Sequence, residues 1–492
     1  MGAGHLRPML ELAKQFVRHG VSVIIPVMTG GPATDLVSKY SNSNPSISFH
    51  ILPQITPTAP HPAPFVNMIN TLKDYNDGLR TFLIMQSDIS PISAIVLDIF
   101  CIHALDVASE LGIPAYFFFT CSASTLSVFF QLLTYLPKHP MGDIGTTIMQ
   151  FSGVPPLLAS HLPSGLFDPT TEQYKLSLYM INRWAEGKGI LVNSFESLEP
   201  RAVRALKDGF CLPNSTTPSI YCIGPVIIYE EQKEERHLCL SWLDTQPKKS
   251  VVFLCFGSKG SFPIEQLKEI ANGLGNKGPY SLFPCCLGCT RIRISTQTEI
   301  PYSYSLFPSY PNTPLENSGQ RFLWVLRSPP TVNPAKVFQQ TAEPDLDILL
   351  PEGFLDRTKD RGMIVQVWVP QVEVLKHEAV GGFVSHCGWN STLEALNFGV
   401  PMICWPLYAE QKMNKVFLVE EMKVGVELKG YEDGFVRADE IEAKVRWIIE
   451  SDGAMDLKNR MMEVKESAIK AMEMEEGGSS FGAFIEFLEC LN

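Results

Sequence analysis

Apolar and polar positions follow two different periods along the chain. Short apolar runs of strand length recur between stretches whose apolar residues repeat with helical spacing, and this alternation predicts an α/β protein with parallel sheets. The predicted strands are Ser22–Val27, Ile92–Leu97, Ile113–Phe119, Gly189–Val192, Val251–Phe256, Phe322–Leu326, Gly382–Ser385 and Met402–Trp405. The predicted helices are Met9–His19, Ala104–Leu111, Ile264–Leu274, Val372–Lys376, Ser391–Asn397 and Lys412–Glu421, with further helical segments from Arg437 onwards.

The pattern divides at Gly224–Arg236, where apolar residues give way to a run of charges. A chain of 492 residues is also too long for one ordinary core. We therefore expect the following division: an N-terminal domain over 1–223, a linker over 224–240, a second domain over 241–470, and a C-terminal helix over 471–492 that packs back on the first domain. Two doubly wound halves would face a cleft, and ligands bind such sheets beyond the carboxyl ends of their strands.

Residues 275–314 do not fit this pattern. They contain six prolines, three cysteines and no sustained helical period, and they separate a predicted helix from a predicted strand. Two explanations of this segment remain possible: a functional lid, or a foreign segment such as a translated intron. We favour the foreign segment, and we expect it to have no catalytic role. The cysteines Cys285, Cys286 and Cys289 lack a second Cys or His pair at zinc-ligand spacing, so we expect no metal there.

Charge and hydropathy narrow the class of protein. The net charge of −12 argues against a nucleic-acid partner, because phosphate binding needs clustered Lys and Arg. The uncharged run Leu111–Pro137 is long enough to span a membrane, but its many hydroxyl residues favour a buried strand followed by a helix. The first twenty residues carry charges inside a helical pattern, unlike a secretory signal. We expect a soluble cytoplasmic protein, a monomer, with no membrane anchor.

The segment Trp368–Gln411 concentrates the candidate chemistry. A strand delivers His386 and Gly388 to a turn, and a helix begins near Ser391. A helix N-terminus presents free N–H groups and the positive end of the helix dipole, which suits a pyrophosphate. Glu394, one turn on, can accept hydrogen bonds from a ribose diol. The alternative is purely structural, since Ser391 and Glu394 also match a capping box.

This segment closely resembles the signature of the plant secondary-product glycosyltransferases, the family 1 UDP-glycosyltransferases. The resemblance extends over most of the chain outside residues 275–314, and it is nearest to the branch that acts on flavonoids and other phenolics. It implies the GT-B architecture of two Rossmann-like domains facing a cleft. It also implies inverting transfer of glucose from UDP-glucose to a hydroxyl of a small phenolic acceptor, without a metal or other cofactor.

The resemblance assigns a role to each residue of the donor site. Trp368 stacks on uracil, with Val369 and Gln371 nearby, and Glu394 holds the ribose. The phosphates are held by Ser258, His386, Asn390 and Ser391, with Gly388 allowing the backbone to approach. The sugar hydroxyls are held by Trp389, Glu410 and Gln411. A final Gln suits glucose, and Trp389 stands where glucuronate-using relatives have Arg.

The catalytic base is expected from the first domain. Acceptor attack needs a base near neutral pH, and a carboxylate behind a His fixes its tautomer and stabilises the imidazolium. In the family resembled, these roles fall on the His of G-x-G-H and on an Asp that closes a strand, here His5 and Asp98. Relatives have a strand before that turn, and in this chain the first strand of the N-terminal domain is apparently missing. The alternatives are therefore a catalytically impaired UDP-sugar-binding protein or an aberrant gene product.

Two further patterns concern the acceptor pocket and a possible metal motif. Phe100, Thr120 and Tyr408 match positions that line the family's acceptor pocket, and they select only for flat aromatic acceptors. Asp345–Asp347 matches the D-x-D metal motif of the other large glycosyltransferase fold, but its position in an expected loop favours a chance match. A dehydrogenase is excluded because no G-x-G-x-x-G follows a strand with an acidic residue about twenty positions on.

Overall fold

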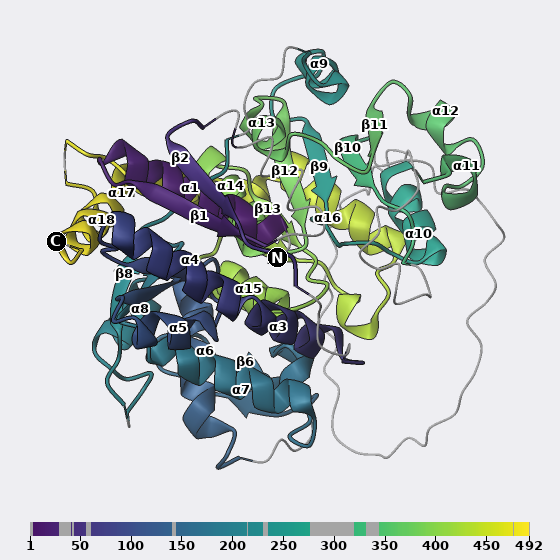
Figure 1. Ribbon diagram of the computed structural model, residues 1–492. Coiled ribbons are helices and arrows are strands. Elements are labelled where there is room, and N and C mark those ends of the chain that lie inside the picture. Colours follow the sequence, from purple (N-terminus) through teal and green to yellow (C-terminus); the bar gives the residue numbers. More distant parts are fainter. Residues whose placement is uncertain are drawn as a thin grey trace, which may run out of the picture.

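The computed structural model describes most of the chain (Figure 1). The described residues are 3–28, 41, 44–55, 61–139, 144–213, 215–229, 235–275, 319–330, 344–475 and 477–491. Beyond Gly275, the segment 275–314 that interrupts the pattern lies outside these residues, as do Cys285, Cys286 and Cys289.

The N-terminal half is built on parallel strands. They are β1 (Val23–Val27), β2 (Ile47–Ile51), β3 (Ile95–Asp98), β4 (Ala115–Phe119), β7 (Gly189–Val192) and β8 (Ser219–Cys222). Among the described residues they form two separate parallel sheets, β1-β2 and β3-β4-β7-β8. Each of β1 and β3 therefore has one partner strand. A short antiparallel pair, β5 (Ile148–Met149) and β6 (Leu157–Leu158), lies outside both sheets.

Helices flank these strands. They are α1 (Ala3–Arg18), α3 (Pro64–Asp74), α4 (Asn76–Ile89), α5 (Ala104–Glu110), α6 (Ala123–Tyr135), α7 (Glu172–Ala185) and α8 (Pro200–Lys207). The prediction that the first helix begins at Met9 was wrong, because α1 begins at Ala3 and includes Pro8. Proline removes a backbone donor and normally interrupts a helix. Pro8 is the sixth residue of α1, so the carbonyl oxygen of Gly4 has no N–H donor within the helix, and it accepts from Asn390 Nδ2 instead. His5 consequently lies within a helix rather than on a preceding turn.

The C-terminal half contains one sheet of six parallel strands. They are β9 (Val251–Cys255), β10 (Arg321–Leu326), β11 (Gly362–Gln366), β12 (Val380–Ser385), β13 (Met402–Cys404) and β14 (Gly425–Glu427). The order in the sheet is β11-β10-β9-β12-β13-β14. The chain thus proceeds outwards from β9 to β11 and then returns to the other side of β9 with β12. The strand order reverses between β9 and β12, and the carboxyl ends of such strands are the usual ligand site of a doubly wound sheet.

The remaining helices cover this second sheet and the end of the chain. They are α9 (Leu238–Asp244), α10 (Ile264–Gly275), α11 (Leu346–Leu349), α12 (Phe354–Thr358), α13 (Gln371–Lys376), α14 (Trp389–Phe398), α15 (Gln411–Val416), α16 (Ala438–Glu450), α17 (Met455–Ala471) and α18 (Ser479–Glu489). Helix α18 runs beside α1 (Figure 1). Phe484 and Phe487 of α18 pack with Phe16 of α1 and with Tyr116 and Tyr221 of the first sheet.

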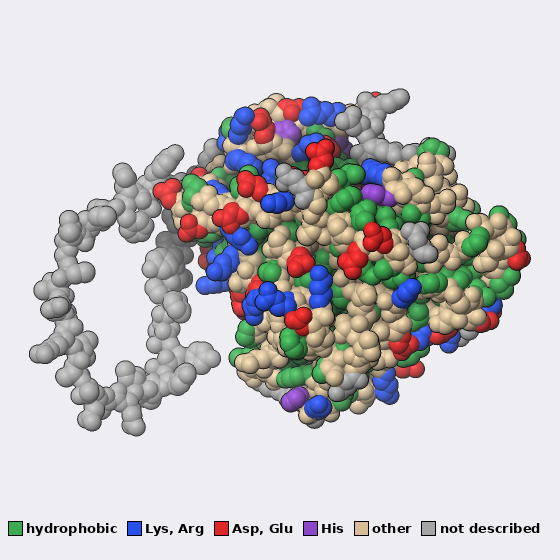
Figure 2. Space-filling model, turned by 90° about the vertical axis from the view of Figure 1, so that its left-hand side faces the viewer, with side chains coloured by type: hydrophobic (Ala, Val, Ile, Leu, Met, Phe, Trp, Pro, Cys, Tyr) green, Lys and Arg blue, Asp and Glu red, His purple; other side chains and the backbone are tan. Residues whose placement is uncertain are grey.

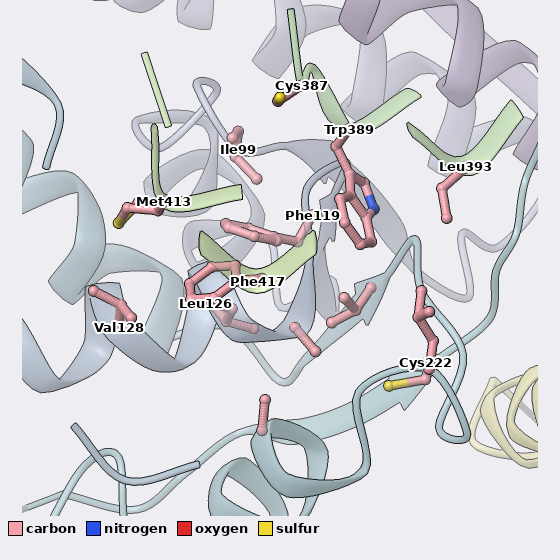
Figure 3. Close-up of a cluster of buried hydrophobic side chains, with 14 of the residues drawn as sticks. Ile99, Phe119, Leu126, Val128, Cys222, Cys387, Trp389, Leu393, Met413 and Phe417 are labelled. Carbon is pink, nitrogen blue, oxygen red and sulfur yellow. The ribbon is translucent and has the colours of Figure 1, made fainter. Parts of the chain in front are cut away.

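A single apolar cluster crosses from one half to the other. Figure 3 shows Ile99, Phe119 and Leu126 of the N-terminal half beside Trp389, Met413 and Phe417 of the C-terminal half. All six side chains are at least 95 % buried. The two halves are therefore held in a fixed relation by a common core as well as by the chain that joins them.

Several elements differ from the sequence prediction. The run Leu111–Pro137 forms β4 and α6, as expected, and none of the described helices combines the length and apolar character needed to cross a membrane. The predicted helix Lys412–Glu421 is α15 followed by a π-helical turn over Phe417–Glu421. Asp345 caps the short helix α11 by accepting from the N–H of Asp347, so the D-x-D segment is not only a loop. Strands β2, β5, β6, β8, β11 and β14 were not predicted.

Candidate active site

The first group of site residues lies at the carboxyl ends of β3 and β4. His5 Nδ1 is 2.8 Å from Asp98 Oδ2 and 3.4 Å from Thr120 Oγ1. The other carboxylate oxygen of Asp98 accepts from the Phe100 N–H at 3.0 Å, and the ring of Phe100 lies 4.7 Å from that of His5. All four predicted residues of the first domain therefore meet at one place.

The surroundings of His5 tune its basicity. Burial lowers its pKa, whereas the charge of Asp98, the hydrogen bond that His5 donates to Asp98 and the charge of Glu410 raise it, and the net effect is a raised pKa. The His5 side chain keeps 23 % of its surface exposed, while that of Asp98 is fully buried. A partly accessible imidazole with a buried carboxylate behind it can accept a proton from a bound hydroxyl group.

The second group lies where the strand order of the second sheet reverses. His386 follows β12, and it stands between Gly257, which follows β9, and Gly388. A Cβ atom on Gly257 or Gly388 would lie only 2.5 or 2.4 Å from His386 Nε2, so both positions require glycine. Burial lowers the pKa of His386 to about 4, and among the described residues its Nδ1 has no hydrogen-bond partner. His386 is thus a neutral imidazole with unused hydrogen-bonding capacity.

Helix α14 begins beside this imidazole. Its N-cap is Gly388, which supplies no side-chain hydrogen bond to the first turn. The capping-box alternative was therefore wrong: Ser391 lies inside the first turn rather than at the N-cap. The first-turn N–H groups and the positive dipole end face the carboxyl ends of β9 and β12, which is a favourable place for a phosphate group.

Ser391 and Glu394 instead belong to a small polar network with α13. Gln371 Nε2 donates to Ser391 Oγ at 2.8 Å and to Glu394 Oε2 at 2.6 Å. Glu394 is 93 % buried, which leaves a carboxylate fixed next to the start of α13. Trp368 is partly exposed at the end of β11 and makes an edge contact with His237 (ring centroids 5.9 Å apart), and Val369 is buried beside it.

Two predicted donor residues make contacts between the halves. Asn390 Nδ2 donates to the carbonyl oxygen of Gly4 at 2.8 Å, next to His5. The indole Nε1 of Trp389 donates to the carbonyl oxygen of Asn193 at 2.7 Å, so this N–H group has a protein acceptor. The carboxyl ends of the two sheets consequently face each other across a short distance.

The remaining predicted residues follow β9 and β13. Gln411 Oε1 accepts from the N–H groups of Leu407 and Tyr408, which fixes the loop that carries Tyr408. Burial is the main cause of the raised pKa of Glu410, and His5 acts against it. Ser258 is exposed in the loop after β9, and Tyr408 keeps 39 % of its surface exposed.

Backbone strain accompanies these residues. Among the described non-glycine residues, five have a positive φ, and three of them adjoin the predicted donor site. Val367 (φ 70°) precedes Trp368, Cys387 (φ 62°) separates His386 from Gly388, and Ala409 (φ 55°) separates Tyr408 from Glu410. Such conformations cost about 1–3 kcal/mol each, and they cluster at functional sites. For Val367 the strain is unusual because its side chain is β-branched.

Sequence reasoning missed several residues that build the site. Asn193 and Asn414 make contacts between the halves, and Gly257 makes room for His386. Only Gly257 carried a usable signal, because it adjoins Ser258 in a turn after a strand. A hollow of about 470 Å³ lies elsewhere and is lined by none of the predicted site residues; its lining includes His61, Asp168 and Glu172.

Comparison with known proteins places this geometry in context. Residues 312–450 match the family model described as UDP-glucoronosyl and UDP-glucosyl transferase. An anthocyanidin 5,3-O-glucosyltransferase from a Rosa hybrid cultivar is 38 % identical, with 99 % of this chain and 96 % of the relative covered. A phloretin 2'-O-glucosyltransferase from Pyrus communis is 39 % identical, with 100 % of this chain and 98 % of the relative covered.

Solved structures agree with these relatives. Phytolacca americana UGT2 in complex with UDP-2fluoro-glucose and pterostilbene has a TM-score of 0.81 at 31 % identity, covering 100 % of this chain and 98 % of that chain. A UDP-glucosyltransferase from Polygonum tinctorium capable of glucosylating indoxyl has a TM-score of 0.79 at 33 % identity, with 100 % and 96 % covered. These matches confirm the predicted GT-B architecture.

Proposed function

The chain belongs to the UDP-glucoronosyl and UDP-glucosyl transferase family, and from this premise we propose that it transfers glucose from UDP-glucose, with inversion, to a hydroxyl of a small phenolic acceptor such as a flavonoid. The observation that carries this proposal is the His5–Asp98 pair, which lies at the carboxyl ends of the first sheet and beside the start of α14 in the second. A base and a phosphate-binding helix end thus meet across the two halves.

In the proposed reaction, the acceptor hydroxyl attacks the anomeric carbon of glucose while His5 removes its proton. The bond between that carbon and the phosphate oxygen breaks, and UDP leaves with the bonding electron pair. Asp98 holds the imidazole in one tautomer and stabilises the imidazolium that forms. A single displacement of this kind inverts the configuration and gives a β-glucoside.

The donor side supplies the complementary interactions. We assign the ribose to Glu394, the diphosphate to His386, Ser258, Asn390 and the first turn of α14, and the sugar to Glu410 and Gln411. Because the Trp389 indole already has an acceptor in Asn193, its contribution to sugar binding would come from its backbone. Trp368 would provide the aromatic surface for the base.

The acceptor class rests on the relatives and on the rings around His5. Anthocyanidins, phloretin and pterostilbene, named for three relatives, are all phenols with at least two aromatic rings. Phe65 of α3 contacts Phe100 edge to face, with ring centroids 6.1 Å apart, so that aromatic surface continues away from His5. A flat aromatic acceptor would stack there with a hydroxyl directed towards Nε2 of His5.

The test uses two substitutions and a pH profile. His5→Ala should lower kcat/KM for a phenolic acceptor by about 10²–10⁴-fold while UDP affinity is unchanged.

Since the base must be neutral and its pKa is raised above the ordinary 6.5, activity should fall with decreasing pH through a value above 6.5. Asp98→Asn removes two of the influences that raise this pKa, so the acidic limb should move to lower pH as the rate decreases. An unchanged rate in His5→Ala would refute the base.

A second candidate is a protein that binds UDP-glucose but transfers it poorly. The observation that favours it is that the described strands of the N-terminal half form two sheets, so that no single sheet of described strands supports the helix that carries His5. The two candidates differ in turnover and not in UDP binding.

We further propose that the protein acts as a cytoplasmic monomer without a metal. Undiminished activity in EDTA and a monomeric mass in solution would support the absence of a metal and the monomeric state, and the opposite results would exclude them.

A further inference from the structure

The predicted site offers the proposed donor diphosphate little positive charge. The end of α14 contributes roughly half an elementary charge. His386, with its pKa of about 4, is neutral at physiological pH and offers a hydrogen bond but no charge. A full positive charge from another side chain would stabilise both the bound diphosphate and the UDP that leaves.

Arg327 stands at the carboxyl end of β10, between the ends of β9 and β11. The carbonyl oxygen of Leu326 accepts from the N–H of Val367 at 3.1 Å, which brings Arg327 next to the strand end that carries Trp368. Side chains along β10 alternate between two apolar clusters, one on each face of the sheet. Leu323 and Val325 belong to the cluster that also contains Val374 of α13 and Leu393 of α14. The cluster on the other face contains Phe322, Trp324 and Leu326. Continuing this alternation directs Arg327 to the face of α13 and α14.

The electrostatic influence of Arg327 agrees with this direction. Burial raises the pKa of Cys255 to about 11, Arg327 acts against this rise, and Glu394 adds to it. Burial likewise raises the pKa of Tyr408, and Arg327 again opposes the rise. The charge of Arg327 is therefore felt at the end of β9 and at the loop after β13, on both sides of the point where the strand order reverses.

Arg327 is partly buried as a residue, and it forms no ion pair with a carboxylate in the described part of the chain. Arg321, at the other end of the same strand, by contrast donates to Gln246 Oε1 at 3.1 Å. A half-buried cation without a counter-charge is unfavourable unless a ligand supplies one. A diphosphate at the end of β9 would supply it.

We propose that Arg327 binds the diphosphate of the donor and offsets its charge, an inference that rests on the proposed use of a UDP-sugar. Its planar fork of donors suits two phosphate oxygens at once. Arg327 then joins the neutral His386 and the α14 N-terminus as the charged member of the phosphate site.

The test compares UDP with uridine, which lacks the diphosphate. Arg327→Gln should weaken UDP binding about tenfold or more in calorimetry, while uridine binding changes less than about twofold. Arg327→Lys should restore part of the UDP affinity, because it keeps the charge but loses the fork. Arg321→Gln is the matched control: it makes the same change on the same strand and should leave both ligands unaffected.

The outcomes separate this proposal from the one it rests on. If Arg327→Gln leaves UDP binding intact, or weakens UDP and uridine equally, the role of Arg327 is refuted. If Arg321→Gln has the same effect on UDP, general surface charge is responsible and the role is again refuted. If the unmodified protein does not bind UDP, the proposed function itself fails.

Discussion

At the scale of single residues, the proposed donor site depends on the room that glycine leaves around His386. Gly388 has an ordinary φ of −66°, so it is required here for space and not for an unusual backbone conformation. A methyl group at this position would collide with His386 Nε2. The imidazole is buried and wedged between two such glycines, so that it has little freedom to move aside.

Gly388→Ala should therefore displace the His386 ring and weaken UDP binding by about tenfold or more, as expected for a lost hydrogen bond to a charged group. Gly482→Ala is the control, because a Cβ there meets nothing within 4 Å and Gly482 lies in α18. That change should leave UDP affinity unaltered and raise stability by up to about 1 kcal/mol. Calorimetric titration with UDP decides the matter, and equal affinities in both variants would contradict the steric explanation.

The site residues that sequence could predict are those with a local signal. His386, Gly388 and Glu394 occur in one strand–turn–helix segment, and Asp98 closes an apolar strand. The contacts of Trp389 with Asn193 and of Asn390 with Gly4 join positions 196 and 386 residues apart, and no local pattern predicts them. The strain at Val367 was equally invisible, because a β-branched residue is a poor candidate for a positive φ.

At the scale of elements, helix α1, which carries His5, packs on two separate sheets and not on one continuous sheet of described strands. α1 packs through Leu12 and Phe16 on Tyr116 and Phe118 of the β3-β4-β7-β8 sheet, and it also contacts β1 and β2. It thus bridges two sheets whose described strands are not paired with each other. Ile24 of β1 is 36 % exposed, whereas every residue of β4 is buried.

A strand placed directly before Gly2 would run parallel to β3, because α1 begins at the carboxyl end of β3 beside Asp98. We expect that adding about six apolar, β-branched residues there raises the thermal midpoint by several degrees and increases turnover of a phenolic acceptor. The gain in turnover should disappear with His5→Ala. A Gly/Ser extension of equal length is the control, and an equal effect of both extensions would rule out strand pairing.

Elements with a strong periodic signal were predictable from the sequence, and weaker ones were not. The fully apolar strands β4, β7 and β9 were located within two residues at each end. Strand β2 was missed because Ser48 and His50 break its apolar run, and β11 was missed because it begins with Gly362 and is only partly buried. The start of α1 was missed because Gly4 and Pro8 are more typical of turns.

At the scale of the whole molecule, the two halves behave as one unit because polar contacts reinforce their common core. Thr125 Oγ1 of α6 donates to Asn414 Oδ1 of α15 at 3.1 Å, and Asn414 Nδ2 donates to the carbonyl oxygen of Cys387 at 3.0 Å. Thr125 and Asn414 are fully buried. Cys387 adjoins His386, so this chain of hydrogen bonds connects the first half directly to the proposed donor site. Acidic and basic side chains are interspersed over the outer face that Figure 2 shows.

Thr125→Val keeps the shape of the side chain but removes its hydroxyl. Ser122 Oγ, which donates to Thr125 Oγ1 at 2.8 Å, then loses its acceptor, and Asn414 Oδ1 loses its donor. Unsatisfied buried groups cost about 1–3 kcal/mol, so the free energy of unfolding should fall by that amount. Since the lost contact joins the halves, urea unfolding should also become less cooperative, with a lower apparent m-value.

The control is Thr358→Val, which removes a buried hydroxyl that donates to the carbonyl oxygen of Phe354 within α12. It should lower the urea concentration at the unfolding midpoint and leave the m-value unchanged. If both variants unfold with the same m-value, the Thr125–Asn414 contact stabilises one half rather than the connection between them.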